Sequence, residues 1–408
     1  MKTEILRKYA ELIARCGLNV QEGQEVMITA DLDQPEFVTM CVEECYRAGA
    51  KKVIVDWVHQ KVTKLHYENQ SLETLSHLEK WQLERWQWQT EQLPCKLFIE
   101  SDDPDGLAGI DQEKVSNARQ KWFPLIKPYR DKMENRYSWC IAAVPGKAWA
   151  KKVFPELSEE SAVEALWDAI LKTSRALEGE PLENWKEHNA DLKRRYDYLN
   201  ALKLRSLHYE SANGTNLTVG LIDGCNFLGG GETTMGGQFF NPNIPSEEIF
   251  TTPRAGEAEG IVYATKPLSY QGQLIENFWI RFEDGRAVEV GAEKNEALLR
   301  KMISMDDGAA KLGECALIPY DSPINNTGIL FFNTLFDENA SCHLALGHGF
   351  SNLLEGFENL TMEECYARGI NDSMIHVDFM IGSSDLNITG TTSTGATVPI
   401  FRNGAWAF

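Results

Sequence analysis

Hydrophobic residues recur with different periods in the two halves of this chain. In the first half, short apolar runs alternate with longer segments in which apolar residues return every three or four positions between charged ones. The runs predict buried strands, and the longer segments predict amphipathic helices. Strands are expected at 25–31, 51–57, 95–101 and 137–144, and helices at 5–16, 35–49, 79–93 and 111–126. Because helices separate the strands, the pattern indicates a parallel sheet with helices on its faces.

The pattern changes near the middle of the chain. Charged helical segments are expected at 158–179 and 182–202, and short strands with glycine turns dominate from about Leu204 onward, at 206–221, 260–267, 277–290 and 327–333. Asp284 and Gly285 separate two apolar runs and predict a tight hairpin turn. At 408 residues the chain exceeds the usual size of one core. We therefore expect an α/β domain over 1–185 and a β-rich, mixed α+β catalytic domain over 186–408.

The net charge and the cysteine content limit which binding partners and which cellular compartment are expected. The formal charge is −20, from 60 acidic and 40 basic residues, which argues against nucleic acid or an anionic membrane as the main partner. No stretch approaches the roughly 20 apolar residues that span a bilayer, and charged residues interrupt the first helix, so no signal peptide is expected. The nine cysteines lie mostly in apolar segments and predict reduced thiols in a cytoplasmic protein.

Several familiar catalytic motifs are missing from the sequence. No G-x-G-x-x-G follows the first strand, so a dinucleotide site of the usual kind is not expected. The glycine-rich segment 229–237 lacks the Lys-Ser/Thr ending of a phosphate-binding loop. No G-x-S-x-G is present, so covalent acyl chemistry has little support.

A strand near the C-terminus carries polar residues in a regular pattern. Residues 375, 377, 379 and 381 are apolar and alternate with His376, Asp378 and Met380. Side chains two positions apart on a strand share a face, so the imidazole and the carboxylate lie about 7 Å apart on one side. Imidazole combined with carboxylates is the ligand set that Zn²⁺, Co²⁺ or Mn²⁺ prefers.

Further acids and a histidine interrupt apolar sequence in the same half of the chain. They are Glu314 at the start of an expected strand, Glu338 and His343 in FDENASCHLALG, and Glu247 and Glu248 between Pro245 and Pro253. Each has a structural explanation: a His–Asp hydrogen bond, a solvated acid, a helix first turn, or loop polarity. Their crowding into one domain favours a metal site instead, because unpaired charge in apolar surroundings is costly.

Four segments in order and spacing carry a resemblance to a known family. They are NIPSEEIFTTP (243–253), GEC (313–315), LFDENASCHLALG (335–347) and HVDFMIG (376–382). With the opening GLNVQEGQEVMITAD (17–31), they make the whole chain similar to the thermophilic metallopeptidase family of aminopeptidase T, aminopeptidase S and aminopeptidase II.

The resemblance implies a function and a ligand set. It implies two divalent cations, usually zinc or cobalt, in the C-terminal domain, and the ligand chemistry adds manganese as a further choice. The implied ligands are Glu248, Glu314, Glu338, His343, His376 and Asp378, with Glu314 or Glu248 bridging the cations or accepting a proton. It also implies a homodimer in which the N-terminal domain helps enclose the cavity. The hypothesis is an aminopeptidase that removes N-terminal residues from short peptides through a water activated by two metals.

One position departs from the family pattern. The resemblance implies a tyrosine seven residues after His343, and this chain has Phe350 there. Phenylalanine has no hydroxyl to donate to a developing oxyanion, and losing such a donor commonly costs a factor of about 10²–10³ in turnover. His348 is a candidate substitute donor. Two alternatives therefore stay open: a metal-dependent peptide-binding protein with weak or lost turnover, and a hydrolase of another amide.

Overall fold

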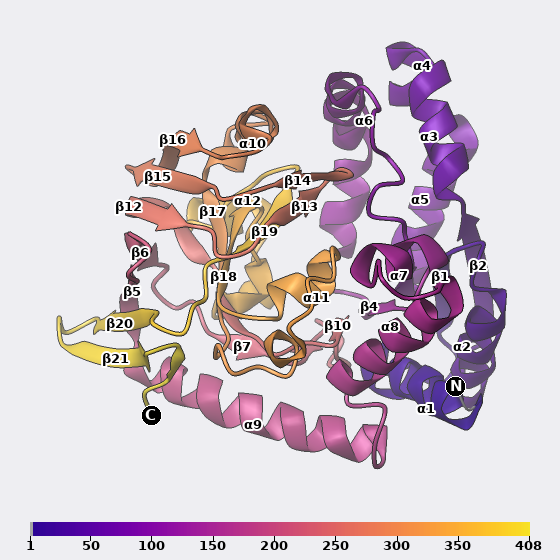
Figure 1. The fold of residues 1–408 in the computed structure, drawn as a ribbon, viewed down its shortest axis with the longest axis horizontal. Helices are drawn as coiled ribbons and strands as arrows, with labels where there is room; N and C mark the ends of the chain where they lie inside the picture. Colours follow the sequence, from indigo (N-terminus) through magenta and orange to yellow (C-terminus); the bar gives the residue numbers. More distant parts are fainter. Residues whose placement is uncertain (1–2) are drawn as a thin grey trace. The chain divides into compact units, whose positions relative to one another are not determined.

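The chain forms two compact units in this computed structural model, which describes residues 3–408. One unit comprises Met1–Asn189 and Gly230–Ser246, and the other comprises Ala190–Gly229 and Glu247–Phe408 (Figure 1). Among the described residues, no helix is long and apolar enough to cross a membrane.

The first unit is built on a five-stranded sheet. Its strand order is β10-β4-β3-β1-β2, and every pairing is parallel. The strands are β1 (Glu25–Asp31), β2 (Lys52–Val58), β3 (Cys95–Glu100), β4 (Trp139–Ala143) and β10 (Asn243–Ile244); β8 (Glu232–Thr233) and β9 (Phe239–Phe240) form a separate small hairpin. The predicted parallel α/β architecture of the N-terminal part is confirmed.

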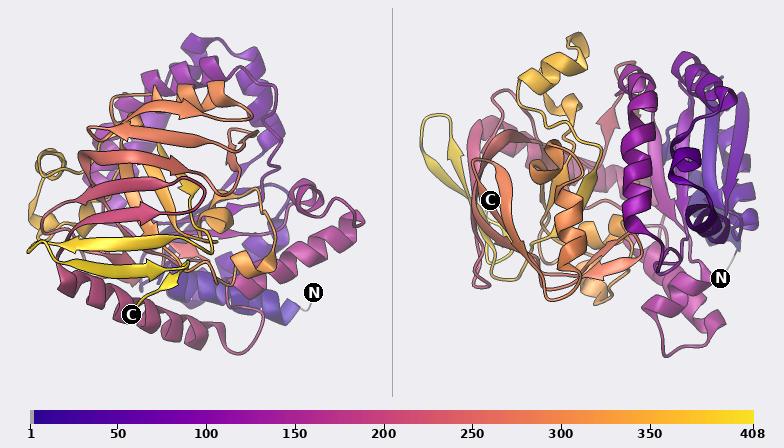
Figure 2. Two further views of the ribbon diagram at one scale, coloured as in Figure 1. Left: turned by 60° about the vertical axis from the view of Figure 1, so that its left-hand side comes forward. Right: turned by 90° about the horizontal axis from the view of Figure 1, so that it is seen from above.

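Helices cover both faces of this sheet (Figure 2). On one face, the turn that follows the first helix brings Gly17 so close to Cys140 that an added Cβ would lie 2.7 Å from its Sγ. On the other face, Lys96 of β3 lies over the ring of Trp86. The helices are α1 (Thr3–Leu12), α2 (Pro35–Arg47), α3 (Gln60–Asn69), α4 (Leu72–Ser76), α5 (Lys80–Gln92), α6 (Gln112–Met133), α7 (Lys147–Val153), α8 (Glu159–Thr173) and α9 (Pro181–Leu202). Helix α6 runs past the expected end at 126, and it includes both Pro124 and Pro128.

The division between the units differs from a single break at residue 185. The division falls after Asn189, inside α9, and the chain returns to the first unit over Gly230–Ser246. That return is made by β10, which adds to the edge of β4 through the pairs Asn243 with Ile141 and Ile244 with Ala142. A strand of two residues is too short to produce a readable hydrophobic period, so the sequence pattern does not reveal it.

The second unit contains two antiparallel sheets. One has the order β19-β18-β17-β11-β7 and the other β16-β15-β12-β6-β5-β20-β21-β22. Apolar residues from both sheets form one core cluster, including Leu207 and Val219 of the larger sheet and Leu344 and Phe379 of the smaller. The predicted β-rich character of the C-terminal part is confirmed.

The elements of this unit have the following bounds. The strands are β5 (Leu204–Glu210), β6 (Asn216–Leu221), β7 (Leu228–Gly229), β11 (Ile249–Thr251), β12 (Pro253–Tyr263), β13 (Leu268–Tyr270), β14 (Gln273–Ile275), β15 (Trp279–Glu283), β16 (Arg286–Gly291), β17 (Leu312–Leu317), β18 (His343–Gly347), β19 (His376–Met380), β20 (Asn387–Thr392), β21 (Thr397–Arg402) and β22 (Ala405–Trp406); the helices are α10 (Glu296–Ile303), α11 (Thr334–Glu338) and α12 (Met362–Ala367).

One expected strand is wrong. The apolar segment 327–333 forms no strand: the 3₁₀ turn Asn325–Thr327 ends at its first residue, and the remainder is a loop. Phe331 in this loop is fully buried and stacks on Phe336 of α11, with ring centroids 4.7 Å apart. The loop therefore buries Phe331 by packing it on the following helix, without pairing in a sheet.

The predicted hairpin is present between β15 and β16. Asp284 and Gly285 have φ angles of 47° and 73°, which are the positive values that a two-residue type I′ turn requires. Gly285 has a second constraint, because an added Cβ would lie 2.1 Å from the carbonyl carbon of Gly256.

Gly285→Ala is expected to destabilise this unit more than Gly395→Ala. Both glycines have positive φ, but nothing lies within 4 Å of a Cβ added at Gly395. Gly395→Ala should therefore lower the free energy of unfolding by only about 1–2 kcal/mol. Gly285→Ala adds a backbone overlap, which costs a further 1–3 kcal/mol, roughly. Urea denaturation of both variants measures the difference, and equal losses would contradict the turn geometry.

Candidate metal centre

The candidate site lies on one face of the smaller sheet of the second unit, β19-β18-β17-β11-β7. Along β17, Cys315 and Leu317 belong to the main core, so Glu314 and Ala316 project from the opposite face. In β18, Leu344 and Leu346 enter the core and His343 takes the other face. In β19, Val377 and Phe379 enter the core, and His376 and Asp378 lie on the other face. Strand alternation therefore explains why polar residues occupy a strand that borders the core.

The strand register places these polar side chains next to one another. Ala345 of β18 pairs with Glu314 on one side and with Asp378 on the other, and Gly347 pairs with His376. Glu248 immediately precedes β11, whose Ile249 pairs with Leu317 at the end of β17. The segment of Glu247 and Glu248 is thus not the first turn of a helix. Glu314 lies inside β17 rather than at its start and is only 4% exposed, so it is not a solvated acid.

Five of the six implied ligands form two groups of three. One group is Glu248, Glu314 and His343, and the other is Glu314, His376 and Asp378; within each, one ligand atom per residue lies within 4.8 Å of the others. Glu314 belongs to both groups. An arrangement in which one carboxylate is shared by two sets of nitrogen and oxygen ligands has the geometry needed to hold two cations close together.

Both imidazoles are oriented by backbone carbonyls. His343 Nδ1 lies 2.8 Å from the carbonyl oxygen of Glu338, and His376 Nδ1 lies 2.8 Å from that of His348. A carbonyl can only accept, so each Nδ1 carries the proton and donates it. Each Nε2 then faces the carboxylates: His343 Nε2 is 3.3 Å from Glu248, and His376 Nε2 is 3.1 Å from Glu314. This is how proteins present a histidine nitrogen to a metal.

Burial makes the carboxylates hard to ionise together. Burial, together with the charges of Glu248 and Asp378, raises the pKa of Glu314 to about 7, although the His376 hydrogen bond opposes the shift. Burial also raises the pKa of Glu338 well above its usual value, together with the charges of Asp378, Glu248 and Glu314. Only Asp378 moves the other way: although burial opposes it, the neighbouring His376 lowers its pKa to about 2.

The histidines carry the compensating positive charge in this structure. Burial alone would lower the pKa of His343, but the hydrogen bond and charge of Glu248 raise it to about 9. The pKa of His376 is raised well above its ordinary value, against burial, by Asp378 and Glu314. A cluster of buried acids whose charge must be balanced by protonated imidazoles is a site where divalent cations can take over that role.

The donor chemistry of the cluster fits divalent cations. Asp378 Oδ1 is buried and has no hydrogen-bond partner among the described residues. It lies 3.4 Å from His376 Nε2 and 3.9 Å from His343 Nε2. This oxygen is therefore close to the histidines of both groups. Oxygen and imidazole nitrogen ligands without a thiolate suit zinc, cobalt or manganese rather than a structural cysteine site.

Glu338 and its neighbour Asn339 stand beside the two groups. Glu338 ends α11, and its carboxyl interacts with that of Asp378. Asn339 is fully buried; its Oδ1 accepts from the Glu247 backbone N–H at 2.8 Å, and its Nδ2 donates to Glu338 Oε1 at 3.3 Å. Asn339 therefore links the segment of Glu248 to Glu338. The sequence pattern suggested only loop polarity here, since one asparagine next to a glutamate gives no spacing signal.

Phe350 lies at the edge of the site, in an apolar setting. Its ring centroid is 5.0 Å from that of His376 and 5.3 Å from that of Phe250, and it packs against a small cluster of Phe250, Ala316 and Leu353. The imidazole Nδ1 of His348 lies 3.8 Å from Asp372 Oδ1, and the backbone carbonyl of His348 accepts from His376.

Comparison with known proteins agrees with this chemistry. The family described as thermophilic metalloprotease (M29) matches residues 2–406. The chain belongs to this family. It is 41% identical to aminopeptidase AmpS of Bacillus subtilis (strain 168) and 40% identical to aminopeptidase T of Thermus aquaticus, covering 99% of this chain and 98% of each relative. The solved structure of wild-type AmpT from Thermus thermophilus matches with a TM-score of 0.89 and 39% identity, over 99% of both chains.

The predicted family is thereby confirmed, and with it the class of chemistry. Members of M29 are metal-dependent peptide hydrolases, so divalent metal binding and hydrolysis of peptide bonds belong to this chain's family. The structural match extends over both units and confirms the expected order of an α/β part followed by a β-rich part.

Asn339→Ala is expected to weaken metal binding without touching a member of either group. The substitution removes the link between Glu247 and Glu338, and losing such an outer partner typically costs 10–100-fold in metal affinity, roughly. Titration of metal-free protein with Zn²⁺, followed by calorimetry, measures the change.

Asn359→Ala is the matched control. Asn359 also donates to the glutamate that precedes it, at 3.1 Å from Glu358 Oε1, but on the exposed surface. Its zinc affinity should equal that of the parent protein. An Asn339→Ala variant that binds zinc as tightly as this control would contradict the positioning role.

Proposed function

We propose that this chain is an aminopeptidase that removes N-terminal residues from short peptides with the help of two divalent cations. The observation that carries this proposal is the sharing of Glu314 between two groups of ligands. The relatives named aminopeptidase, which match over almost the whole chain, support the choice of the N-terminal peptide bond as the point of attack.

Each residue of the site has a proposed role. Glu314 would be shared between the two cation positions, because it is the one residue among those described that belongs to both groups. His343 and Glu248 would complete one position, His376 and Asp378 would complete the other, and Glu338 would add its carboxylate beside Asp378. When bound, the cations supply Lewis acidity, which lowers the pKa of a water molecule and polarises the scissile carbonyl. One of the two carboxylates, Glu248 or Glu314, would accept the proton of the attacking water.

The identity of the metal and the assembly state belong to the same proposal. Oxygen and imidazole ligands favour zinc or cobalt, with manganese as a third choice. The resemblance supports a homodimer whose first unit helps enclose the substrate. A cytoplasmic location is supported by nine cysteines that are all unpaired among the described residues.

A second candidate function is favoured by one residue. Phe350 presents a phenyl ring next to His376, where the family resemblance implies a hydroxyl. A protein that binds peptides through its metals but turns them over weakly would keep the ligand groups and lose that donor. Measurement of turnover separates the two candidates, since only the aminopeptidase releases amino acids.

Removal of metal is expected to abolish the hydrolysis of an aminoacyl p-nitroanilide, and Zn²⁺, Co²⁺ or Mn²⁺ should restore it. Glu314→Gln should reduce the affinity of both cation positions by more than about 100-fold, because the shared ligand loses its charge. His376→Ala should empty one position and leave the other occupied. Metal analysis of the purified variants, beside the assay, gives the stoichiometry.

Glu289→Gln is the control for the charge change, because Glu289 is exposed and pairs with Arg281 on the larger sheet. It should keep both metals and full activity. Activity that survives chelation, or a Glu314→Gln protein that still holds two cations, would refute the two-metal site.

Phe350→Tyr is expected to raise turnover, by up to about 10²–10³-fold if the new hydroxyl reaches the developing oxyanion. The effect should appear in kcat with unchanged metal content, since Phe350 is not a ligand. His348→Ala tests the alternative donor. Alanine keeps the backbone carbonyl that orients His376, so activity should persist; a large loss with intact metal content would instead assign the imidazole as the donor.

A further inference from the structure

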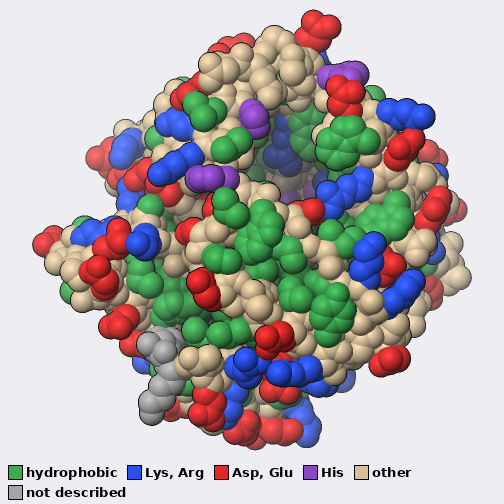
Figure 3. Space-filling view, turned by 90° about the vertical axis from the view of Figure 1, so that its right-hand side faces the viewer, with side chains coloured by type: hydrophobic (Ala, Val, Ile, Leu, Met, Phe, Trp, Pro, Cys, Tyr) green, Lys and Arg blue, Asp and Glu red, His purple; other side chains and the backbone are tan. Residues whose placement is uncertain are grey.

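The first unit contains a hollow that shares no residue with the metal centre. It lies among α3, α4, α5 and α6 and has a volume of about 1170 Å³. Its lining includes the aromatic residues Tyr67, Trp81, Trp86 and Trp122. The face of the first unit in Figure 3 shows a hollow bordered by hydrophobic and histidine side chains, with a basic side chain in its depth.

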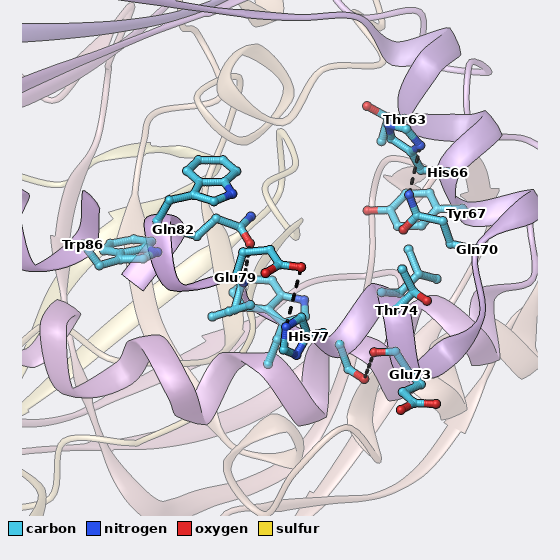
Figure 4. A pocket seen from close by; sticks show the side chains of 15 residues that line it. Thr63, His66, Tyr67, Gln70, Glu73, Thr74, His77, Glu79, Gln82 and Trp86 are labelled. Atoms are coloured by element: carbon cyan, nitrogen blue, oxygen red, sulfur yellow. Dashed lines mark hydrogen bonds and ion pairs between the residues drawn. The ribbon is translucent and has the colours of Figure 1, made fainter. Parts of the chain in front are cut away.

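The wall of the hollow is aromatic, with polar groups arranged along it. Figure 4 shows His66, Tyr67 and Gln70 on one side, and Glu79, Gln82 and Trp86 on another. His66 Nδ1 lies 3.1 Å from Gln70 Nε2, and His77 lies 3.7 Å from Glu79. Trp81 is 62% exposed, although an indole gains much by burial. A large hollow with aromatic surfaces and a few polar side chains has the make-up of a small-molecule site.

Lys96 supplies a positive charge next to this wall. The residue is only 9% exposed, and its Nζ lies 5.3 Å from the ring centroid of Trp86 and 4.7 Å from that of Tyr137. Within residues 3–408, which the structure describes, the Nζ forms neither a hydrogen bond nor an ion pair. Aromatic faces attract an ammonium group but do not replace a counter-anion. A buried cation without an anion is costly, so an anionic ligand at this position would be favoured.

The surroundings of Lys96 add to the positive potential. Burial, together with the charges of Arg130 on α6 and Arg85 on α5, lowers the pKa of Lys96 to about 8. Arg85 is paired with Asp56, and Arg130 lies near the buried carboxyl of Glu134. Neither Asp56 nor Glu134 is among the groups that shift the pKa of Lys96. The ammonium therefore remains the local charge that lacks a partner.

We propose that this hollow binds a small carboxylate with an aromatic body, the ring lying against Trp86 and Trp122 and the carboxylate pairing with Lys96. The volume accommodates such a molecule with room for further groups. The proposal does not depend on the metal centre or on the proposed function.

The test compares N-acetyl-phenylalanine with its neutral amide on the metal-loaded protein, using calorimetry. Blocking the amino group prevents either probe from being an aminopeptidase substrate. The acid should bind at least about tenfold more tightly than the amide, because a charge-assisted hydrogen bond is stronger than a neutral one. Equal affinities, no binding of either probe, or tighter binding of the cation phenethylamine would overturn the proposal.

Lys96→Met locates the interaction. It keeps the length of the side chain and removes the charge, so the preference for the acid should disappear, while Lys96→Arg should keep it. Lys80→Met is the matched control, because Lys80 lies on the same helix as Trp86 and its side chain is 90% exposed. A carboxylate that binds at the metals would bind Lys96→Met as tightly as the parent protein, and that result would also overturn the proposal. Melting curves of the three variants confirm that each is folded.

Discussion

The interaction on which this structure depends is the mutual repulsion of buried carboxylates on one face of a sheet. Glu248, Glu314 and Asp378 lie within a few ångströms of two imidazoles, and each is less than a tenth exposed. Like charges in such surroundings can be held only by positive charge, whether from protons or from cations. The raised pKa values of Glu314 and Glu338 reflect this need for positive charge. Divalent metals, which the family uses, supply such charge.

The opposite face of the same sheet makes this arrangement stable. Leu344, Leu346, Val377 and Phe379 join the core that the two sheets of the second unit share. Their burial contributes the hydrophobic free energy that holds the strands in register. Because the strand period is two, the register that buries these side chains also directs His343, His376 and Asp378 to the site. The strand pairing that packs the core therefore also positions the polar side chains of the site.

Backbone and side-chain groups from neighbouring segments orient the polar side chains of the candidate site. The carbonyl groups of Glu338 and His348 set the tautomers of the two histidines, and Asn339 joins the segments of Glu247 and Glu338. These contacts connect residues that are far apart in sequence. Phe350 lies in the same surroundings but contributes apolar surface to His376. The first unit has a separate organisation, with an aromatic hollow and with Lys96, which has no ion-pair partner within residues 3–408, on the opposite side of its sheet from Gly17 and Cys140.

The sequence by itself determined the class of each unit and the face of each ligand strand, because hydrophobic period depends only on local side-chain order. Strands such as 25–31 and the alternation around His376 were readable for this reason, and the motifs indicated the family. Only the tertiary structure decided that residues 230–246 return to the first sheet, that 327–333 packs as a loop, that Glu314 is shared by two groups, and that Asn339 is a buried link. Each of these depends on contacts between distant segments, and a period along the chain carries no information about such contacts.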